Sequence, residues 1–432
     1  MFVSDCLNIN NEGHLTIGGV DTVEIAKEYG TPVIVYDEDA IRKNCRAFVN
    51  SIDEYYNGHG RVLYANKAFS CLEMCRISNE EKMGLDVVSG GEIYTALKAG
   101  FPADKLYFHG NNKSYDELKY ALENGIGRII VDNPDELQTI SEIAKESGIT
   151  ANIYMRIKPG IDAHTHDFVK TGQIDSKFGV ALETGEALDI IKKAVKTENI
   201  DYCGIHCHIA SQVFDVKPFV DAAEVMMDFI KVIKDETGAD TKELNLGGGF
   251  GVAYTEDEET VKYEIFMEAV SEIIHKKAEE HGVVLPFILM EPGRSIVAAA
   301  GITLYTVGGI KEIPNIRTYV SVDGGMADNP RYILYQSKYT FCVANKASEP
   351  KTETVTIAGK CCESGDLLGE GVKLQKAEIG DTLAVLTTGA YNYSMASHYN
   401  RIPNPAVVMV RDGRARVVVK RETYEDLIKN DI

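Results

Sequence analysis

Two glycine-containing segments and one lysine are the residues of this chain with the clearest chemical potential. The segments are "NLGGGFG", residues 245–251, and "EPGR", residues 291–294, and the lysine is Lys67 in "RVLYANKAFS". Glycines let backbone N–H groups approach an anion without side-chain obstruction, and an arginine adds charge and directed donors. The pattern predicts a phosphate site, provided that both segments lie on the same rim of the fold.

Lys67 by itself indicates little, because a lysine at the end of a strand is usually solvated. A lysine amine that faces a phosphate can hold an aldehyde as a Schiff base, which is how proteins bind pyridoxal 5′-phosphate. That cofactor also needs an acid opposite its ring nitrogen, and Glu291 is the candidate, although it could instead pair only with Arg294. In "GIHCHIAS", His206 and His208 lie on one face of a predicted strand. His208 could stack on the cofactor ring or be a hydrogen-bonded core histidine.

Eight β-rich segments, alternating with amphipathic helical patterns, would position these residues between about residues 30 and 295. The predicted strands are "RVLYA", "GLDVVS", "KLYFHG", "RIIVDN", "NIYMRIKP", "YCGIHCHI", "ELNLGG" and "FILMEPG". This alternation is typical of an α/β fold with a TIM-like (β/α)₈ barrel, and an open doubly wound sheet is the alternative. In a barrel, Lys67 follows the first strand and the two glycine segments follow the seventh and eighth. Barrel active sites lie at these strand ends.

The second predicted domain is an antiparallel β-sandwich or β-barrel. After Arg294 the helical periodicity fades, and strand-and-turn patterns such as "ITLYTVGGIKEI", "ETVTIAG" and "RARVVVK" take over. The segment "HLTIGG", residues 14–19, could add a strand to this domain. We therefore predict a cofactor-binding barrel over residues 30–295 and a β domain formed by residues 1–29 and 296–432.

Bulk properties narrow the function classes. The formal net charge of −20 argues against a nucleic-acid partner, which needs clustered Lys and Arg, and requires that any anion site be built from local donors. No apolar run is long enough to cross a membrane, and the first 15 residues do not resemble a signal peptide, so we expect a cytoplasmic protein without a membrane partner. The nine cysteines are expected to be free thiols, and no CxxC pair indicates a metal site.

These motifs occur in a known order. "YANKAFS", "GLDVVSGGE", "HGNNKS", "MRIKPGIDAHTHDFVKTGQIDSKFG", "HCHIASQ", "NLGGGFG", "EPGRSIV", "CESGD" and "GAYNYSMASHYN" resemble the diaminopimelate decarboxylases over residues 15–425. That family belongs to the barrel-type (fold type III) pyridoxal-phosphate decarboxylases, together with the ornithine and arginine enzymes. The resemblance implies decarboxylation of meso-2,6-diaminopimelate to L-lysine, the last step of lysine biosynthesis, by a homodimer that shares its active sites.

The resemblance also implies residue roles. Lys67 would carry the Schiff base, Glu291 would face the ring nitrogen and His208 would stack on the ring. The remaining cofactor-binding positions would be Asp86, Glu92, Ser211, Gly248, Gly249, Gly293, Arg294 and Tyr391. Without the resemblance, Asp86 and Glu92 are better explained as a helix cap and an exposed acid of a first helical turn.

Substrate binding would fall to Arg294, Arg331, Tyr335, Glu363 and Tyr391. Cys362 would protonate the carbanion, and Glu363 would bind the distal ammonium in the neighbouring subunit's site. Without the resemblance, Cys362 would be read as a small buried hydrophobic residue.

Alternatives remain at this stage. A related decarboxylase for arginine, ornithine or carboxynorspermidine, a barrel-type racemase, and a pyridoxal-phosphate carrier without turnover would share the lysine. His164 and His166 could be a metal pair, but we expect loop hydrogen bonds and no metal. The chain departs from the family at Ala210, where glycine is usual, and at Lys360 and Cys361, where small residues or proline are common.

Overall fold

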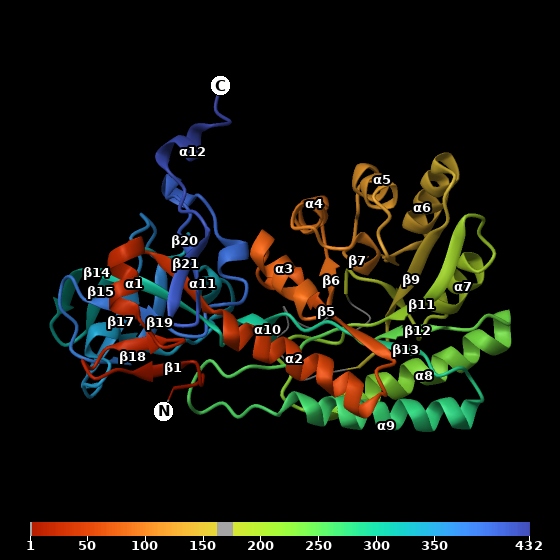
Figure 1. The fold of residues 1–432 in the computed structure, drawn as a ribbon, viewed down its shortest axis with the longest axis horizontal. Helices are drawn as coiled ribbons and strands as arrows, with labels where there is room; N and C mark the ends of the chain where they lie inside the picture. The colour runs from red at the N-terminus through yellow and green to blue at the C-terminus, as the bar shows by residue number, and fades with distance from the viewer. Residues whose placement is uncertain (1, 162–175) are drawn as a thin grey trace. The chain divides into compact units, whose positions relative to one another are not determined.

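The computed structural model describes residues 2–161 and 176–432, which form two compact units (Figure 1). The barrel unit comprises Cys45–Gly251 and Thr260–Gly293, and the β unit comprises Met1–Asn44, Val252–Glu259 and Arg294–Ile432. Helix α2 (Glu38–Tyr55) has residues in both units. The predicted loop histidines His164 and His166 lie outside the described residues.

The barrel unit is a closed ring of eight parallel strands. Each strand pairs with its neighbour, and the last pairs with the first, which closes the ring and excludes the open doubly wound sheet. All eight predicted strands are present, so the predicted barrel is confirmed. They are β5 (Gly60–Ala65), β6 (Gly84–Val87), β7 (Leu106–Phe108), β8 (Arg128–Val131), β9 (Ala151–Lys158), β11 (Ile200–His206), β12 (Glu243–Asn245) and β13 (Phe287–Met290).

Helices connect the barrel strands, as the amphipathic patterns predict. They are α3 (Leu72–Glu80), α4 (Gly90–Lys98), α5 (Tyr115–Glu123), α6 (Pro134–Ser147), α7 (Glu186–Ala194), α8 (Lys217–Thr237) and α9 (Tyr263–His281), and a short strand β10 (Val180–Ala181) pairs with β9. Helix α6 shows why its bounds are readable from the sequence. Asn133 caps its N-terminus through two backbone N–H groups, and Gly148 ends it in the left-handed conformation.

Packed side chains fill the barrel. One buried cluster takes a residue from each of six strands: Leu63, Tyr107, Ile130, Tyr154, Cys203 and Leu289. Strands buried on both faces need apolar residues almost continuously, which explains the short hydrophobic runs in the sequence. The interior is therefore a core, and polar chemistry is left to the strand ends.

The main sheet of the β unit has the order β18-β17-β15-β14-β4-β20-β21, and off this path β19 pairs with β14 and β16 pairs with β19. The strands are β4 (Val33–Asp37), β14 (Gly301–Ile313), β15 (Arg317–Val322), β16 (Phe341–Val343), β17 (Glu353–Ala358), β18 (Leu367–Leu374), β19 (Thr382–Val385), β20 (Ala406–Arg411) and β21 (Arg414–Val419). The predicted antiparallel domain is confirmed except for two parallel pairs, β15–β17 and β4–β20.

The segment "HLTIGG" forms β2 (Leu15–Ile17), which belongs to a separate three-stranded sheet with β1 (Leu7–Ile9) and β3 (Val20–Asp21). Leu15 and Ile17 are nevertheless buried in the same apolar core as Val35, Ile302 and Val408 of the main sheet. The helices of this unit are α1 (Thr22–Tyr29), α10 (Arg294–Val297), α11 (Arg331–Tyr335) and α12 (Tyr424–Ile428).

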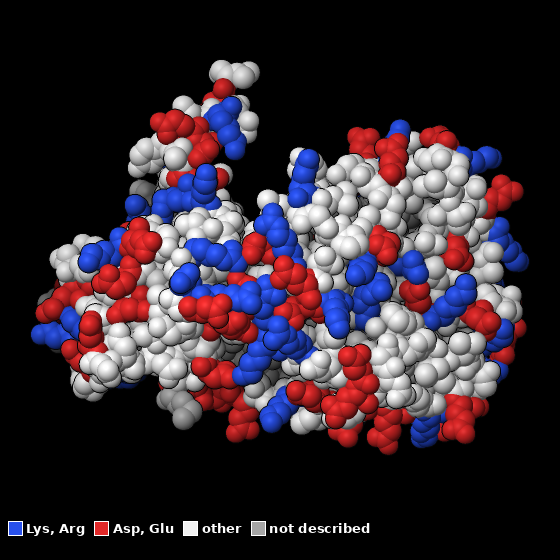
Figure 2. Space-filling view, viewed as in Figure 1, with Lys and Arg blue, Asp and Glu red and all other residues white. Residues whose placement is uncertain are grey.

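Acidic and basic side chains are interspersed over the face shown in Figure 2. Many form exposed pairs one helical turn apart, such as Lys217–Asp221 and Lys231–Asp235 on α8. Such surface pairs contribute little to stability, because water and salt screen them. In the described part of the chain, no helix combines the length and the apolar character needed to span a membrane.

Candidate active site

Lys67 lies in a 3₁₀ turn (Asn66–Ala68) directly after β5, at the C-terminal end of the barrel. It is exposed, whereas its neighbour Asn66 is buried and donates a hydrogen bond to Ser70 Oγ at 2.9 Å. Gly293 packs against this turn, because a Cβ added there would lie 2.9 Å from Ala65 Cβ. The loop after the eighth strand therefore closes onto the turn that carries the lysine.

Two acids near Lys67 have raised pKa values. Burial raises the pKa of Asp86 on β6, and His109 and Lys67 act against this rise. Burial also raises the pKa of Glu92, to about 7. Glu92 Oε2 accepts a hydrogen bond from Val88 N at 2.9 Å, and Ser89 caps the same helix. Glu92 therefore stabilises the start of α4 and also contributes to the electrostatics around Lys67.

Glu291 follows β13 and is the centre of a buried polar cluster at this end of the barrel. His109 Nε2 lies 2.7 Å from Glu291 Oε1, and Asn245 Nδ2 donates to the same oxygen at 2.7 Å. His206 Nε2 lies 3.3 Å from Oε2. Burial alone would raise the pKa of Glu291, but His109 and His206 outweigh it and hold the pKa well below its usual value. Glu291 is thus a buried, ionised carboxylate.

His208 follows β11 and is held as a neutral imidazole. Gly248 N donates to His208 Nδ1 at 3.2 Å, so Nδ1 is the acceptor and carries no proton. Burial lowers the pKa of His208 well below its usual value, and Lys67 lowers it further. A flat, uncharged ring is the form that stacks best on another aromatic ring.

The glycines of "NLGGGFG" have a packing role that the sequence did not reveal. A Cβ on Gly248 would lie 2.0 Å from Glu291 O, and one on Gly249 (φ +109°) would lie 2.1 Å from Ala210 O. The N–H of Gly247 donates to Asn245 Oδ1, and that of Gly248 donates to His208. These glycines are required for the close approach of neighbouring strand ends, whether or not a phosphate is present.

The loop that contains Ser211 runs beside the glycine loop. Val213 N donates to Gly249 O and Gly251 N donates to Val213 O, each at 2.9 Å. Ala210, the departure from the family pattern, is fully buried between these segments. The predicted residues Ser211, Gly248 and Gly249 are therefore brought together.

Three residues of the barrel site were missed from the sequence: His109, Asn245 and Arg156. Arg156 lies on β9, is buried, and interacts electrostatically with Asp132, Glu291 and Asp86. Each follows or interrupts an apolar strand with a polar side chain. That interruption, in "KLYFHG", "ELN" and "IYMRIK", was the signal available in the sequence.

The β unit holds a second cluster, built from arginines and aromatic rings. Arg294 is buried, donates from Nη1 to Tyr254 Oη at 2.6 Å, and lies 4.8 Å from the ring centroid of Tyr391. Arg331, on α11, lies 5.3 Å from the Tyr391 ring and 5.2 Å from the Tyr335 ring. The predicted residues Arg294, Arg331, Tyr335 and Tyr391 are therefore brought together around one tyrosine ring.

Arg331 keeps N–H groups in this cluster that could donate hydrogen bonds to a bound anion. Arg331 is buried, forms no ion pair with a described carboxylate, and its Nε has no hydrogen-bond partner in the described part of the chain. Tyr391 has φ +70°, a conformation that is unfavourable for a bulky residue by about 1–3 kcal/mol. Tyr254, Tyr339 and Asn392 complete the cluster and were not predicted. Tyr254 contacts Tyr339 edge-on, and Tyr339 Oη donates to Asn392 Oδ1 at 3.4 Å.

Cys362 and Glu363 lie at the exposed end of a turn in the β unit, whereas Cys361 is buried. Asp366 fixes this turn. Its Oδ1 accepts from Met326 N at 2.6 Å and its Oδ2 accepts from Cys361 N at 2.7 Å. The turn is therefore ordered, with Cys362 and Glu363 exposed on a single chain.

Comparison with known proteins connects these clusters to a family. The sequence model of one protein family, described as "Pyridoxal-dependent decarboxylase, pyridoxal binding domain", matches residues 38–298. The diaminopimelate decarboxylase of Bacillus subtilis (strain 168) is 49% identical over 432 residues, covering 100% of this chain and 98% of the relative. That of Bacillus methanolicus is 49% identical over 422 residues and covers 98% of each chain.

The chain belongs to the diaminopimelate decarboxylases, within the pyridoxal-dependent decarboxylases. A crystal structure of diaminopimelate decarboxylase from M. jannaschii in co-complex with L-lysine superposes with a TM-score of 0.92 at 36% identity, covering 100% of this chain and 99% of that one. The predicted family, enzyme class, fold class and cofactor are confirmed.

The barrel residues of this diaminopimelate decarboxylase family member fit pyridoxal 5′-phosphate. An exposed amine, a neutral flat imidazole and a buried anion suit its aldehyde, its ring and its ring nitrogen, respectively. Asp86 Oδ1 is also buried and has no hydrogen-bond partner among the described residues.

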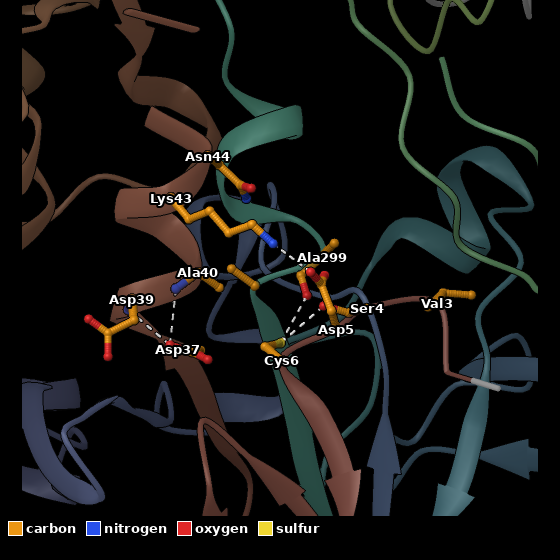
Figure 3. Close-up of a pocket in the computed structure, with 11 residues that line it drawn as sticks. Val3, Ser4, Asp5, Cys6, Asp37, Asp39, Ala40, Lys43, Asn44 and Ala299 are labelled. Atoms are coloured by element: carbon orange, nitrogen blue, oxygen red, sulfur yellow. Dashed lines mark hydrogen bonds and ion pairs between the residues drawn. The ribbon is translucent and has the colours of Figure 1, made fainter. Parts of the chain in front are cut away.

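A cleft of about 270 Å³ elsewhere in the β unit contains none of the predicted residues (Figure 3). It is lined by the start of the chain, α2 and Ala299–Ala300, and Lys43 crosses it to pair with Asp5 at 2.5 Å. Cys6 donates to Ala299 O, and burial raises its pKa to about 11, so this thiol is not a nucleophile near neutral pH.

Proposed function

We propose that this enzyme removes one carboxyl group from meso-2,6-diaminopimelate and releases L-lysine. The observation that carries the proposal is the full-length identity of 49% to the Bacillus subtilis diaminopimelate decarboxylase, together with a barrel that retains the exposed Lys67 and the buried, ionised Glu291. The lysine bound in the M. jannaschii diaminopimelate decarboxylase structure supports the predicted product. The proposed domains are the cofactor-binding barrel of residues 30–295 and the β domain of residues 1–29 and 296–432.

Pyridoxal 5′-phosphate, when bound, supplies a ring that takes up the electron pair left by the departing carboxyl group. Lys67 would hold the cofactor through its aldehyde. Glu291 would hold a proton at the ring nitrogen, and His208 would cover the ring. The phosphate would be bound by the barrel loops of Ser211, Gly248, Gly249 and Gly293, with Arg294 and Tyr391.

The β unit binds the substrate. Arg294 and Arg331, with Tyr335 and Tyr391, orient carboxylates, because buried guanidinium groups bind these anions with directed hydrogen bonds. Glu363 accepts hydrogen bonds from the distal ammonium, and Cys362 donates a proton to the α-carbon after carbon dioxide leaves. A substrate with two ammonium–carboxylate pairs requires both charge types, and this set of residues supplies them.

We also propose a homodimer in which Cys362 and Glu363 act in the neighbouring subunit's site. The exposure of both residues in a single chain supports this arrangement. The cytoplasmic location expected from the sequence stays a prediction.

Release of labelled carbon dioxide from meso-diaminopimelate, compared with arginine, ornithine and carboxynorspermidine, tests the proposed function. We expect turnover of meso-diaminopimelate alone, or at least a hundredfold preference in kcat/KM, since a missing distal carboxylate leaves a buried arginine unpaired. Faster turnover of arginine or ornithine would assign the chain to the alternative reaction.

A further inference from the structure

Three side chains from three different strand ends converge on Glu291: His109 after β7, His206 on β11 and Asn245 on β12. All three are at least nine-tenths buried, and the rings of His109 and His206 pack edge to face with centroids 4.8 Å apart. A second hydrogen bond, from Gly247 N to Asn245 Oδ1, fixes the amide so that its Nδ2 faces the carboxylate. The carboxylate is thus oriented before any ligand arrives.

The distances determine where protons lie. His206 Nε2 forms a hydrogen bond of 3.3 Å with the anionic Glu291 Oε2, so it must carry a proton, because two lone pairs at that distance repel. For His206, burial lowers the pKa to about 4, so the ring is neutral with its single proton on Nε2. Its Nδ1 is buried without a hydrogen-bond partner among the described residues, which an unprotonated nitrogen tolerates better than an N–H group does.

Asp86 is a second carboxylate next to His109, and a comparison of its contacts with those of Glu291 shows which of the two acids carries the negative charge. Asp86 Oδ1 lies 3.9 Å from His109 Nε2 and has no hydrogen-bond partner in the described chain. Glu291 is paired with Asn245 and His206 through hydrogen bonds, and its Oε1 lies 2.7 Å from His109 Nε2. Lys67, Arg156 and Glu92 also act electrostatically on this pair of carboxylates. The negative charge is therefore concentrated on Glu291.

We infer that His109, His206 and Asn245 are positioning residues that keep Glu291 ionised and aimed, so that it can hold the proton on the ring nitrogen of pyridoxal 5′-phosphate. This inference rests on the proposed function. These three residues come from the motifs "HGN", "HCH" and "ELN". They would share one role, which acts through Glu291 and not directly on the substrate.

The test uses the holoenzyme reconstituted with cofactor labelled with ¹⁵N in the ring, and follows the ¹⁵N chemical shift against pH. In the wild type we expect the shift of a protonated ring up to at least pH 8. His109→Leu and His206→Leu should each move the midpoint of ring deprotonation down by one pH unit or more, and raise the Kd for the cofactor about tenfold. His206→Gln, which retains an N–H donor, should restore most of both values.

His275→Leu is the matched control, because His275 lies in the same unit but bonds to Ser271 O on α9. It should leave the ring titration unchanged. If both leucine variants titrate like the wild type, the inference is wrong. Should a leucine variant not fold, Asn245→Ala removes the hydrogen bond from Asn245 Nδ2 to Glu291 and tests the same claim.

Failure of the proposed function can be distinguished from failure of the inference. The ionisation of Glu291 can be followed in the protein without cofactor, by carboxylate infrared difference spectra against Glu291→Gln. A low Glu291 pKa that rises in His109→Leu supports the positioning role even if no amino acid is decarboxylated. An unchanged Glu291 pKa contradicts it even in an active enzyme.

Discussion

The barrel unit and the β unit each bury a charged cluster, but they stabilise it in different ways. In the barrel, the carboxylate of Glu291 is paired with His206 and Asn245 through hydrogen bonds and lies 2.7 Å from His109 Nε2. In the β unit, Arg331 is surrounded by the tyrosine rings of Tyr335 and Tyr391 and meets no described carboxylate.

The difference teaches what each cluster is prepared to bind. An anion that neighbouring polar groups hold in one orientation keeps its charge at a fixed place, which suits it to holding one proton on a bound cofactor. A cation that faces aromatic rings keeps its N–H groups directed at an incoming anion, because cation–π contacts use the face of the guanidinium plane and not its donors. We therefore expect the barrel cluster to bind the cofactor and the cluster in the β unit to bind carboxylates.

Lys67→Ala tests cofactor binding by the barrel and should have the largest effect of the substitutions considered. We expect loss of the visible absorbance of the bound cofactor and a fall in kcat of the order of 10³-fold or more, as for the removal of a covalent nucleophile. Absorbance spectra and carbon dioxide release measure both effects. Lys119→Ala, on the exposed surface of α5, is the control. Retained cofactor absorbance in Lys67→Ala would place the imine on another lysine.

Arg331→Gln tests the β side. Removal of a charged, directed donor should raise KM for meso-diaminopimelate about 10–100-fold, equivalent to about 1.4–2.7 kcal/mol, with the cofactor spectrum unchanged. Arg331→Lys should recover only part of this loss, because an ammonium lacks the guanidinium fork. Arg317→Gln, which loses an exposed pair with Glu370 and a contact with the Tyr319 ring, should retain the wild-type KM. An unaltered KM in Arg331→Gln would remove Arg331 from the substrate site.

Asp366→Asn tests the turn of the β unit that carries Cys362 and Glu363, because Asp366 fixes that turn. An amide in place of the carboxylate leaves Met326 N or Cys361 N without its acceptor, which we expect to release the turn and lower kcat/KM about tenfold. Thiol labelling followed by peptide mapping should show the buried Cys361 reacting at least about tenfold faster. Asp412→Asn, in an exposed hairpin turn, should change neither value. Lower activity with Cys361 still protected would show that the turn is not the cause.

The smallest expected effect concerns a buried carboxylate of the β unit that behaves oppositely to Glu291. Burial raises the pKa of Asp328 to about 7, against hydrogen bonds from Tyr305 and Gly325 that lower it, and Asp366 and Asp323 raise it further. Between pH 4 and 7 the folded protein therefore holds a proton that the unfolded chain has released, so this group makes the free energy of unfolding fall as pH rises.

Asp328→Asn should remove that dependence. Relative to the wild type, the variant's free energy of unfolding should improve by about 1–2 kcal/mol between pH 5 and pH 6.5, whatever its offset at pH 5. Urea unfolding at both pH values measures this difference, with Asp412→Asn as the control. A difference that stays constant with pH would show that Asp328 is already ionised at pH 5.

The sequence by itself determined the repeating architecture and the place of the chemistry within it. Strand periods, helix caps such as Asn133 and Gly148, and the order of eight apolar runs are local properties of the chain. Because parallel strands align their C-terminal ends, these properties were enough to assign Lys67, His208 and Glu291 to one rim of a barrel.

Only the tertiary structure decided which polar groups meet. His109 and Asn245 are separated from Glu291 by 182 and 46 residues, and no local pattern couples them to it. Residues 252–259 lie between two barrel elements in sequence yet belong to the β unit. There, Tyr254 O accepts a hydrogen bond from Thr340 Oγ1, and Tyr254 Oη accepts one from Arg294. Hydrophobic periodicity follows from the repeat of the backbone, so a short stretch of sequence is enough to reveal it. Buried charges, in contrast, are stabilised by contacts between distant residues, and these contacts exist only in the folded protein.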